Sequence, residues 1–438
     1  MSYLSEKLIQ EGISRFKSYK SKARRKQNEK HLNYYSGTSI WQYIQPYFAI
    51  DAFKEIPVYE SNLTRKFVNK MSRVYTIAPE RKSSVQYKKL TEGKDLKMKH
   101  VERITRLLGT LATEVCFDDK KNIFTYHPIY YYDCFFGDND PFNPVAIIYP
   151  ILNPVDDVSY NKGKEKFCYL DERIKRVYDG EGNIEHEEEH YYECLPVLFS
   201  HKEEQLDSFF VEGASDIINA NEHVNITLTE MQLGLRFQMF GQPYATGVYE
   251  DSAVTRTGSN VIINLPENAS YGIATPGGNI KDVIENLKFQ ISLVAQNNHL
   301  MVYFEENADR PSSGLALLIK DFERMEDYKD DLEMWRIYEK KLYYIERKIA
   351  EANNISLPES FSVKFIEPEY PKSVSEQIAK DNWDMEQGLT TKEDILIREE
   401  RDLTKSQAKK VIEKNLESQP KEEPQEEKEN SFPPKKKG

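Results

Sequence analysis

The sequence predicts an α+β protein in which long helices accompany an antiparallel β region. Apolar residues recur every three or four positions over most of residues 1–113 and again from residue 214 onward, which is the period of amphipathic helices. Between residues 114 and 200 the period changes to two, in short β-branched and aromatic runs interrupted by Gly, Asn, Asp and Pro. The chain has 438 residues, enough for two or three compact modules.

Three helices are expected before the β region. The first covers about the first 35 residues, with Ile9, Ile13 and Phe16 on one side and the basic run RFKSYKSKARRK on the other. A second helix is predicted over residues 62–75 and a third over 99–113, each from its apolar spacing. The basic run is typical of a solvated helix face, and contact with nucleic acid is the alternative interpretation.

The middle of the chain predicts two helices that flank a small insert. Residues 214–240 and 280–298 keep helical spacing, and the Gly- and Pro-rich stretch 241–279 between them predicts a β insert. Opposite its apolar side, the first of these helices carries five uncharged polar residues: Asn219, Asn221, Asn225, Thr227 and Thr229. We therefore expect a pair of helices joined by a small β element.

The longest helix is predicted over residues 313–352, after a loop at 297–313. At 1.5 Å per residue it spans on the order of 60 Å, more than a globular core needs, which is typical of a strut in an assembly. A strand and three short helices follow, and each helix begins at a Ser or Thr with an acidic or Gln residue about three positions later.

The charge of the chain is distributed unevenly. The formal net charge is −12, but residues 1–31 carry nine Lys and Arg against three Asp and Glu. Residues 417–438 carry a net charge of −1, which leaves −17 for residues 32–416. An acidic body does not attract duplex DNA, so a tight DNA-binding module is disfavoured. The acidity serves solubility or, alternatively, keeps a surface that lies near DNA from adhering to it.

Several classes of protein are excluded by composition. No run of 18 or more apolar residues exists, so the sequence predicts no membrane-spanning helix. The N-terminus lacks the apolar segment of a signal peptide, so we expect no export. The widely spaced Cys116, Cys134, Cys168 and Cys194 predict reduced thiols in a cytosolic setting rather than a disulfide framework.

One catalytic motif is present, since residues 186–190 read His-Glu-Glu-Glu-His and match the HExxH signature of zinc peptidases. That chemistry requires a helix, on which His186 and His190 would lie one turn apart and share a metal. Here the motif follows the turn DGEGN and precedes an alternating segment, so we expect a strand, in which the two positions lie about 13 Å apart. The favoured interpretation is a solvated edge of a β-hairpin, whose charges discourage pairing with another sheet.

No other pattern suggests catalysis. The sequence contains no GxxxxGK[ST] loop, no GxGxxG after a strand and no GxSxG elbow, and its carboxylates show no pair singled out by spacing. We therefore expect a protein that is not an enzyme and that needs no cofactor and no metal.

Four segments carry a resemblance to a known family. They are NLTRKFVNKMSRVYTIAPE, then LPVLF with DSFFVEGASDIINANEHVNITLTEM, then RPSSGLALLIKDFE, and finally FSVKFIEPEYPKSVSEQIAKDNWDMEQGLTTKEDIL. With the order helices, β region, helix, insert, helix, loop, long helix and helical C-terminus, the chain resembles the portal proteins of tailed bacteriophages. The resemblance covers about residues 60–416, and residues 241–279 show no match to it.

The resemblance implies the portal fold, assembled as a ring and divided into named regions. These are a wing (1–213), a first stem helix (214–240), a clip (241–279), a second stem helix (280–298), a tunnel loop (299–313), a long wing helix with a strand (314–370), a helical crown (371–416) and a disordered tail (417–438).

The resemblance also implies a function and partners. Portal rings, usually of twelve subunits, lie at a unique capsid vertex of the virion and assemble in the host cytoplasm. Viral double-stranded DNA passes through the channel without sequence specificity during packaging and ejection. The implied protein partners are the terminase during packaging, the head-completion or adaptor and neck proteins afterwards, and the major capsid and scaffolding proteins. No membrane is involved. The acidic body and the Asn/Thr side of helix 214–240 are consistent with a channel wall along which phosphates slide.

The loop at 297–313 matches the portal loop that narrows the channel around DNA. Its expected channel residues are Asn297, Asn298, Glu305, Glu306, Asn307 and Arg310, and Ser313, Gly314, Ala316 and Leu317 match the start of the long helix. A plain surface turn, with Leu300 and its neighbours packed into the adjacent subunit, is the alternative. For the whole protein, the alternatives are a zinc metallopeptidase through His186 and His190, or another ring-forming virion scaffold without DNA transit.

Overall fold

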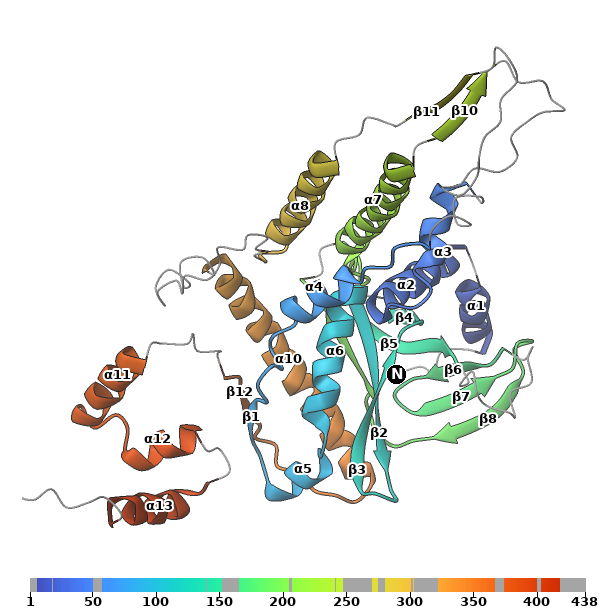
Figure 1. The fold of residues 1–438 in the computed structure, drawn as a ribbon. Coiled ribbons are helices and arrows are strands. Elements are labelled where there is room, and N and C mark those ends of the chain that lie inside the picture. The colour runs from blue at the N-terminus through green and yellow to red at the C-terminus, as the bar shows by residue number, and fades with distance from the viewer. Residues whose placement is uncertain are drawn as a thin grey trace, which may run out of the picture. The chain divides into compact units, whose positions relative to one another are not determined.

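The computed structural model describes most of the chain and is of the mixed α+β class that the sequence predicts (Figure 1). It separates into unit 1, formed by Met1–Pro311 and Lys320–Pro368, and unit 2, formed by Ser312–Ile319 and Glu369–Gly438. The described residues are 6–17, 19–49, 57–138, 140–151, 165–204, 207–240, 242–246, 270–274, 280–300, 302, 322–366, 374–399 and 403–417.

Unit 1 holds the β region and the longer helices. Its helices are α1 (Glu6–Phe16), α2 (Tyr19–Ser36), α3 (Trp41–Ile44), the 3-10 helix η1 (Gln45–Tyr47), α4 (Leu63–Met71), α5 (Val85–Leu90), α6 (Lys94–Leu108), α7 (Ser215–Phe240), α8 (Ile280–Asn297) and α10 (Phe322–Ala352). Its strands are β1 (Glu80–Lys82), β2 (Thr110–Asp118), β3 (Ile123–Ile129), β4 (Asp133–Gly137), β5 (Asp140–Pro150), β6 (Phe167–Leu170), β7 (Ile174–Tyr178), β8 (Ile184–Glu189), β9 (Val197–His201), β10 (Gln242–Thr246), β11 (Ser270–Ala274) and β12 (Ser362–Lys364).

The strands described between residues 110 and 201 are antiparallel, as the sequence predicts for residues 114–200, and they form two separate sheets. One sheet has five strands in the order β4-β5-β6-β7-β8, and the other has three in the order β3-β2-β9. The chain passes from β3 to β4 through Tyr130–Tyr132, so one continuous aromatic run of the sequence contributes to both sheets. Two further antiparallel pairs, β1 with β12 and β10 with β11, lie outside this block.

The main core lies between α6, α10 and the three-stranded sheet. Helix α10 contacts β2, β9 and β12, while α6 packs on β2 and β3 (Figure 1). Trp335, Leu342 and Ile349 of α10 are buried in this core, and the Trp335 ring meets the ring of Tyr75 edge-on at 5.3 Å. Burial of a large side chain of this kind stabilises the fold by about 1.5–3 kcal/mol. Helix α10 is therefore a core element along its described length.

The N-terminal prediction of one basic helix is wrong, because the structure has two helices, α1 and α2. Ile9, Ile13 and Phe16 of α1 pack against the five-stranded sheet, whereas α2 contacts α4, α6 and α7. The Arg25 guanidinium donates to the carbonyl oxygen of Phe16 at 3.0 Å and satisfies one of the unpaired carbonyls at the end of α1. A single straight helix could not reach both surfaces.

The two following helices end earlier than predicted. Helix α4 ends at Met71 instead of residue 75, because the buried Glu102 carboxylate accepts the backbone N–H groups of Val74 and Tyr75 at 2.8 and 3.1 Å. Helix α6 ends at Leu108 instead of residue 113, because Gly109 adopts a φ of +83° that favours glycine. The apolar positions beyond Gly109 belong to β2, whose first six residues are buried.

Residues 214–298 fold as the predicted helix pair, where they are described. Helices α7 and α8 contact each other, and the antiparallel pair β10–β11 connects their ends, with Thr246 opposite Ser270 (Figure 1). The rest of the predicted clip lies outside the described residues, as do the first residues of the predicted long helix and residues 418–438 of the predicted tail. Glu417, the first residue of that predicted tail, is instead the last residue of a helix. The described long helix is α10, with 31 residues, which corresponds to about 46 Å.

The Asn/Thr side of α7 does not form an open polar wall, which corrects the sequence interpretation. Asn221, Asn225 and Thr229 are at most 1% exposed. The Asn225 side chain accepts from the N–H of Ser61 at 2.7 Å and donates to the carbonyl oxygen of Ser61 at 3.0 Å. The Thr229 hydroxyl accepts from the N–H of Tyr59 at 3.1 Å. These side chains supply hydrogen-bond partners for the backbone of Tyr59 and Ser61, which belong to no strand.

Unit 2 contains three short helices in its described part: α11 (Val374–Glu386), α12 (Lys392–Glu399) and α13 (Lys405–Glu417). The predicted capping box is present at α12, where the hydroxyl of Thr391 accepts from the N–H of Asp394, and the Asp394 carboxylate accepts from the N–H of Thr391. Arg398 of α12 donates twice to Asp381 of α11, at 3.0 and 2.7 Å. None of the described helices of either unit is long and apolar enough to cross a bilayer.

Candidate functional site

The segment that leaves α8 is the described beginning of the loop predicted to narrow a channel. His299 has a φ of +51°, and the N–H groups of His299 and Leu300 donate to the carbonyl oxygens of Gln296 and Ala295 at 2.9 and 2.7 Å. This is the Schellman arrangement, which ends a helix with one left-handed residue followed by a buried apolar residue. Leu300 is 4% exposed and packs in the core of its own subunit. The loop therefore starts from a firmly anchored point.

Asn297 and Asn298 are the two predicted channel residues that the structure describes. Asn297 is exposed at the end of α8. The Asn298 amide instead donates to the Asp216 carboxylate at the start of α7 and to the carbonyl oxygen of Val294, both at 2.9 Å. The remaining predicted residues of the loop and of the long-helix start lie outside the described residues: Glu305, Glu306, Asn307, Arg310, Ser313, Gly314, Ala316 and Leu317.

A cleft of about 730 Å³ lies beside this segment and is lined by charges of both signs. Its walls come from α4, α6, α10 and residues 297–300, and Arg106 of α6 forms an ion pair with Asp331 of α10 there. The charged lining residues are Lys70, Arg73, Arg106, Lys202, Glu203, Glu204, Asp216, Asp330 and Asp331. Because the two signs nearly balance, the cleft has no strong preference for phosphate.

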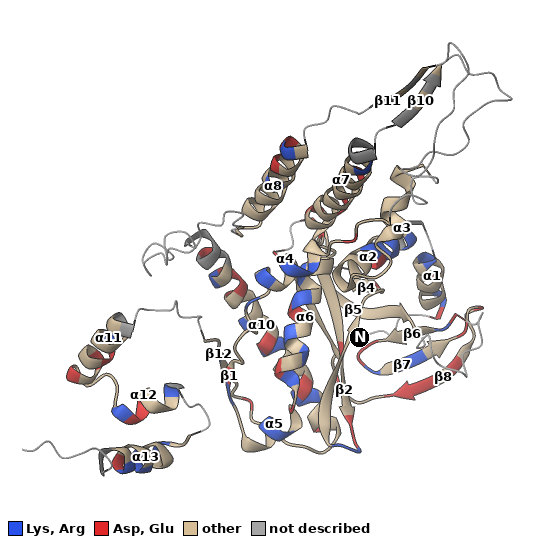
Figure 2. Cartoon of the chain, in the orientation of Figure 1, with Lys and Arg blue, Asp and Glu red and all other residues tan. Residues whose placement is uncertain are grey.

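The HExxH motif lies on a strand, as the sequence predicts, and the strand is the outer one of the five-stranded sheet. All six residues of β8 are exposed, and Figure 2 shows this strand almost entirely in red. His186 pairs in register with Val177 of β7, and His190 lies after the end of the strand. Within the described parts of the chain, no group of three or more His, Cys, Asp or Glu residues could hold a metal ion.

His190 is not solvated, which corrects the expectation for this motif. Its side chain is 8% exposed, its ring stacks on Tyr192 at 4.4 Å, and its backbone N–H donates to the carbonyl oxygen of Arg173 at 2.7 Å. Burial lowers the pKa of His190 below its usual value, so the ring is neutral at pH 7. The second histidine of the motif is a packing residue.

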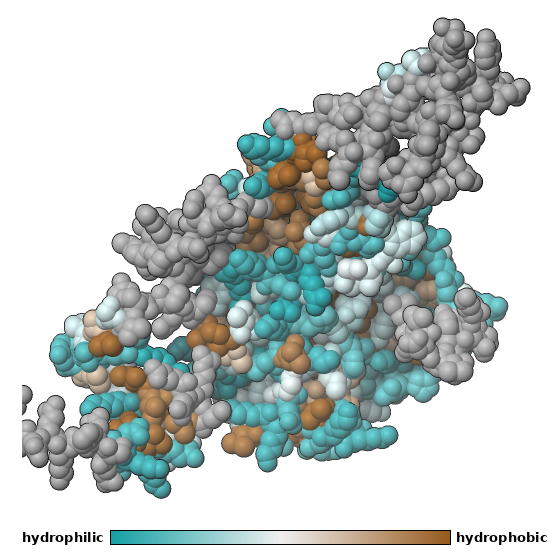
Figure 3. Space-filling view, viewed as in Figure 1, coloured by the Kyte–Doolittle hydropathy of each residue, from teal (hydrophilic) through white to brown (hydrophobic). Residues whose placement is uncertain are grey.

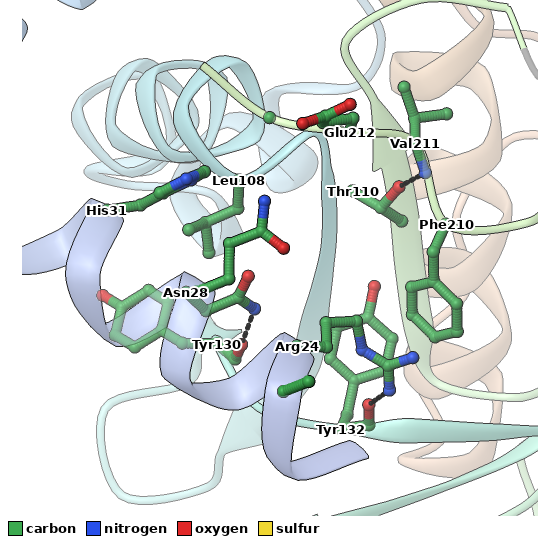
Figure 4. Close-up of a pocket in the computed structure, with 13 residues that line it drawn as sticks. Arg24, Asn28, His31, Leu108, Thr110, Tyr130, Tyr132, Phe210, Val211 and Glu212 are labelled. Carbon is green, nitrogen blue, oxygen red and sulfur yellow. Dashed lines mark hydrogen bonds between the residues drawn. The ribbon is translucent and has the colours of Figure 1, made fainter. Parts of the chain in front are cut away.

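A pocket of about 470 Å³ lies between α2, the start of β2 and residues 210–213 (Figure 4). Arg24, Gln27, Asn28 and His31 of α2 line it from one side, at helical spacing. The opposite wall includes Thr110, Tyr132, Phe210 and Glu212. The junction is tight, since a Cβ atom on Gly213 would lie 2.2 Å from the carbonyl oxygen of Leu107. The pocket lies directly before the start of α7.

A buried network of charges holds α10 against β1, α5, α6 and β3, and sequence reasoning missed it. Glu339 and Glu346 of α10 are both 0% exposed. Arg81 donates twice to Glu339, at 3.0 and 2.6 Å, and Lys94 donates to Glu346 at 2.9 Å and lies 3.4 Å from Glu339. Burial by itself raises the pKa of Glu339, but Lys94 and Arg81 outweigh it and hold the pKa at about 2.

Three tyrosine hydroxyls complete this network. Tyr75 donates to Glu339 at 2.8 Å, Tyr87 donates to Glu346 at 2.7 Å, and Tyr126 also donates to Glu346. The sequence does contain a signal for this site, because Glu339 and Glu346 occupy the apolar stripe of α10 between Trp335, Leu342 and Ile349. Carboxylates that interrupt such a stripe predict buried cationic partners.

The four cysteines are free thiols. Burial raises the pKa of Cys116 and of Cys194 to about 12 and that of Cys168 to about 11, and it also raises the pKa of Cys134. A thiol with a raised pKa is a poor nucleophile at neutral pH. These side chains therefore act as small packing residues.

Comparison of the chain with models of protein families finds no match, and comparison with curated proteins finds none either. The function of the chain therefore has to be inferred from its own residues and their arrangement.

Proposed function

We propose that this chain is the portal protein of a tailed bacteriophage, the subunit of a ring at one capsid vertex through which double-stranded DNA enters and leaves. The observation that carries the proposal is the helical hairpin formed by α7 and α8, with the β10–β11 pair at its end and the long helix α10 after the following loop. This order matches the stem, clip and long wing helix of the resemblance drawn from the sequence.

The second support is an apolar face that the subunit leaves uncovered on α8. Phe289 is 67% exposed and Leu293, one turn further along the same side of the helix, is 45% exposed, and Figure 3 shows hydrophobic surface at this helix pair. Leu287 and Ala295 of the same helix are buried toward the rest of the subunit. A helix that is apolar on more than one side requires a further partner. A head-to-tail ring supplies one, because each subunit presents one face to each neighbour.

The third support is the way in which α10 is held. Its buried carboxylates engage β1, α5, α6 and β3, so the helix that follows the channel loop is attached to the wing at several points. In the proposed ring, a loop that presses on DNA would transmit load to the wing through this helix. The acidic charge of residues 32–416 fits a channel that does not bind phosphate.

The two alternatives receive less support. A zinc peptidase would need His186 and His190 to bind one metal ion. His186 lies within β8 and is exposed, whereas His190 follows the last residue of β8 and is buried. A ring-forming virion scaffold without DNA transit would account equally well for the α7–α8 hairpin and its exposed apolar side. It differs from the proposal only in the width of its central pore.

The test is the mass and the shape of the purified protein. Native mass spectrometry should give twelve copies of 51.3 kDa, about 616 kDa, and electron microscopy should show closed rings with a pore wide enough for duplex DNA. A stable monomer or dimer at every protein concentration would overturn the proposal. Closed rings whose pore is too narrow for a duplex would favour the scaffold alternative. Stoichiometric zinc, measured in the same sample, would favour the peptidase.

A further inference from the structure

The pocket beside the start of α7 contains a buried hydroxyl group without a partner. Tyr132 is 4% exposed, and no other group in the described structure makes a hydrogen bond to its hydroxyl oxygen. In Figure 4 this hydroxyl points into the pocket, toward the space between Thr110 and Asn28. A buried hydroxyl that loses its bonds with water costs about 1–3 kcal/mol if nothing replaces them. The site is therefore built to receive a hydrogen-bonding group.

The positive charge of Arg24 in the wall of this pocket is paired, and one negative charge remains at the rim. Arg24 forms an ion pair with Asp133, donates to the carbonyl oxygen of Tyr132 at 2.7 Å, and lies 3.7 Å from the centre of the Phe210 ring. His31 is 3% exposed, and burial lowers its pKa to about 4, so it is neutral at pH 7. The remaining charge is Glu212, which is exposed at the rim. Away from this rim, a charged ligand buried in the pocket would have no free counter-charge beside it, which is costly.

The polar groups of the wall offer both acceptors and donors. The Asn28 amide nitrogen donates to the carbonyl oxygen of Tyr130 at 2.8 Å, and the Gln27 amide nitrogen donates to the Ser215 hydroxyl at 3.0 Å. Each side chain thus retains its amide oxygen as an acceptor and one N–H as a donor, and Tyr132 supplies a further donor. The complementary ligand is neutral, with one acceptor and N–H donors.

We propose that this pocket binds a neutral primary carboxamide, whose oxygen accepts from the Tyr132 hydroxyl and whose N–H groups donate to the amide oxygens of Asn28 and Gln27. A carboxamide has one carbonyl acceptor and two N–H donors, so it can pair with the Tyr132 hydroxyl and with both amide oxygens at once. Its source is a free small amide or the side chain of a Gln or Asn on a protein partner. The inference is independent of the proposed function, since it depends only on the pocket.

Three molecules of nearly the same shape separate the carboxamide from charged ligands: acetamide is neutral, acetate is an anion and acetamidinium is a cation. Saturation-transfer NMR with the full-length protein at pH 7 should give acetamide an affinity at least fivefold above that of either ion. Equal affinity for all three, or preference for one of the ions, would overturn the proposal.

Substitutions assign the binding to this pocket. Tyr132→Phe removes only the unpartnered hydroxyl and should weaken acetamide binding about five- to tenfold, which corresponds to one hydrogen bond. It should not lower the melting temperature, since no protein group loses a partner. Tyr131→Phe, at the neighbouring half-buried tyrosine, is the matched control and should bind acetamide like the wild type. Gln27→Met, at an exposed position of α2, is a second variant and should also weaken binding. Unchanged binding by Tyr132→Phe and by Gln27→Met would place acetamide elsewhere and overturn the proposal.

The source of the carboxamide is resolved by a capped Gly-Gln-Gly peptide compared with acetamide and with capped Gly-Glu-Gly. Tighter binding of the Gln peptide than of acetamide, with no binding of the Glu peptide, identifies a protein side chain. Binding of acetamide without the Gln peptide identifies a free small amide. Equal binding of the Gln and Glu peptides would contradict recognition of the carboxamide.

Discussion

Lys94 is the residue on which the packing of α10 most depends. It is 1% exposed, and its ammonium group lies between two carboxylates that are themselves fully buried. Hydrogen bonds from three tyrosines and the second cation, Arg81, satisfy the carboxylates further. In such a network the net gain over an apolar core is small, but loss of one member leaves a buried charge without its partner.

Lys94→Met should therefore destabilise the protein by about 3–5 kcal/mol in urea unfolding. Lys97→Met is the control, because Lys97 is exposed on the same helix and its loss should cost no more than about 0.5 kcal/mol. Similar stability of the two variants would show that Glu346 finds another partner or takes up a proton at little cost.

His31 makes the stability of unit 1 dependent on pH. Burial is the main cause that lowers its pKa from 6.5 to about 4, and its Nδ1 donates to the carbonyl oxygen of Leu107 at 3.1 Å. The unfolded chain binds a proton at this residue first, so its contribution to stability is complete above pH 6.5 and is lost as the pH falls from 6.5 to about 4.

His31→Gln keeps a donor for Leu107 but does not titrate. Between pH 7 and pH 5, the wild type should lose about 2 kcal/mol more unfolding free energy than this variant. Glu102 acts in the opposite direction, because burial raises its pKa to about 7 and its contribution is lost as the pH rises from 4.5 to 7. Both proteins contain Glu102, so it cancels in the difference. His127→Gln, at an exposed histidine of β3, should leave the pH dependence unchanged, and parallel curves for all three proteins would contradict the assignment.

At the scale of elements, several helices end at one residue in the left-handed conformation. Helix α10 ends like α8, with Asn354 at a φ of +60° and the N–H of Ile355 donating to the carbonyl oxygen of Ala350 at 2.8 Å. In unit 2, Gly388 ends α11 in the same way. Each of these ends directs the chain sharply away from the helix axis and so fixes where the next segment begins.

The polar side of helix α7 binds the backbone of Tyr59 and Ser61, and this can be tested with two asparagines of the same helix. Asn225→Ala removes both partners of the Ser61 backbone and should cost about 2–3 kcal/mol in unfolding free energy. Asn219→Ala, at an exposed position, should not lower the unfolding free energy and should raise it by up to about 0.7 kcal/mol, because Ala has a higher helix propensity than Asn. Equal costs would mean that the Ser61 segment is not bound to the helix in solution.

At the scale of the whole molecule, the proposed ring makes a prediction for the loop after α8. Glu305→Lys with Glu306→Lys changes the charge of each subunit by four units. If the loop faces DNA, rings should form normally, hold DNA more tightly at low salt and package it more slowly. The measurement is packaging in an assembly assay across a series of salt concentrations.

The control carries the same charge change at a different place. Glu188→Lys with Glu189→Lys alters two exposed residues of β8 and should leave packaging and its salt dependence as in the wild type. Normal packaging by the loop variant would show that Glu305 and Glu306 do not face the channel.

Much of the fold was predictable because its signals are local. The periods of two and of 3.6 identified the β region, α7, α8 and α10, since each period depends on neighbours a few residues apart. The ends of helices were less predictable. Helix α4 ends where the Glu102 carboxylate binds the backbone that follows it, which is a contact between different elements of the fold, and α6 ends at Gly109. The strand character of the HExxH segment was also a local property, and the structure confirms it.

By itself, the sequence determined the α+β class, the order of the elements and the pair of helices around a small β element. Only the tertiary structure decided which polar residues are buried. Asn225 meets Ser61, Glu346 meets Lys94, and Tyr132 lies in a pocket whose other wall is formed by α2. The partners in these contacts lie about 100 residues or more apart, so no short-range pattern encodes them. Whether an Asn, a Glu or a Tyr ends in water or in the core depends on which distant element packs over it, and that choice is made only when the whole chain folds.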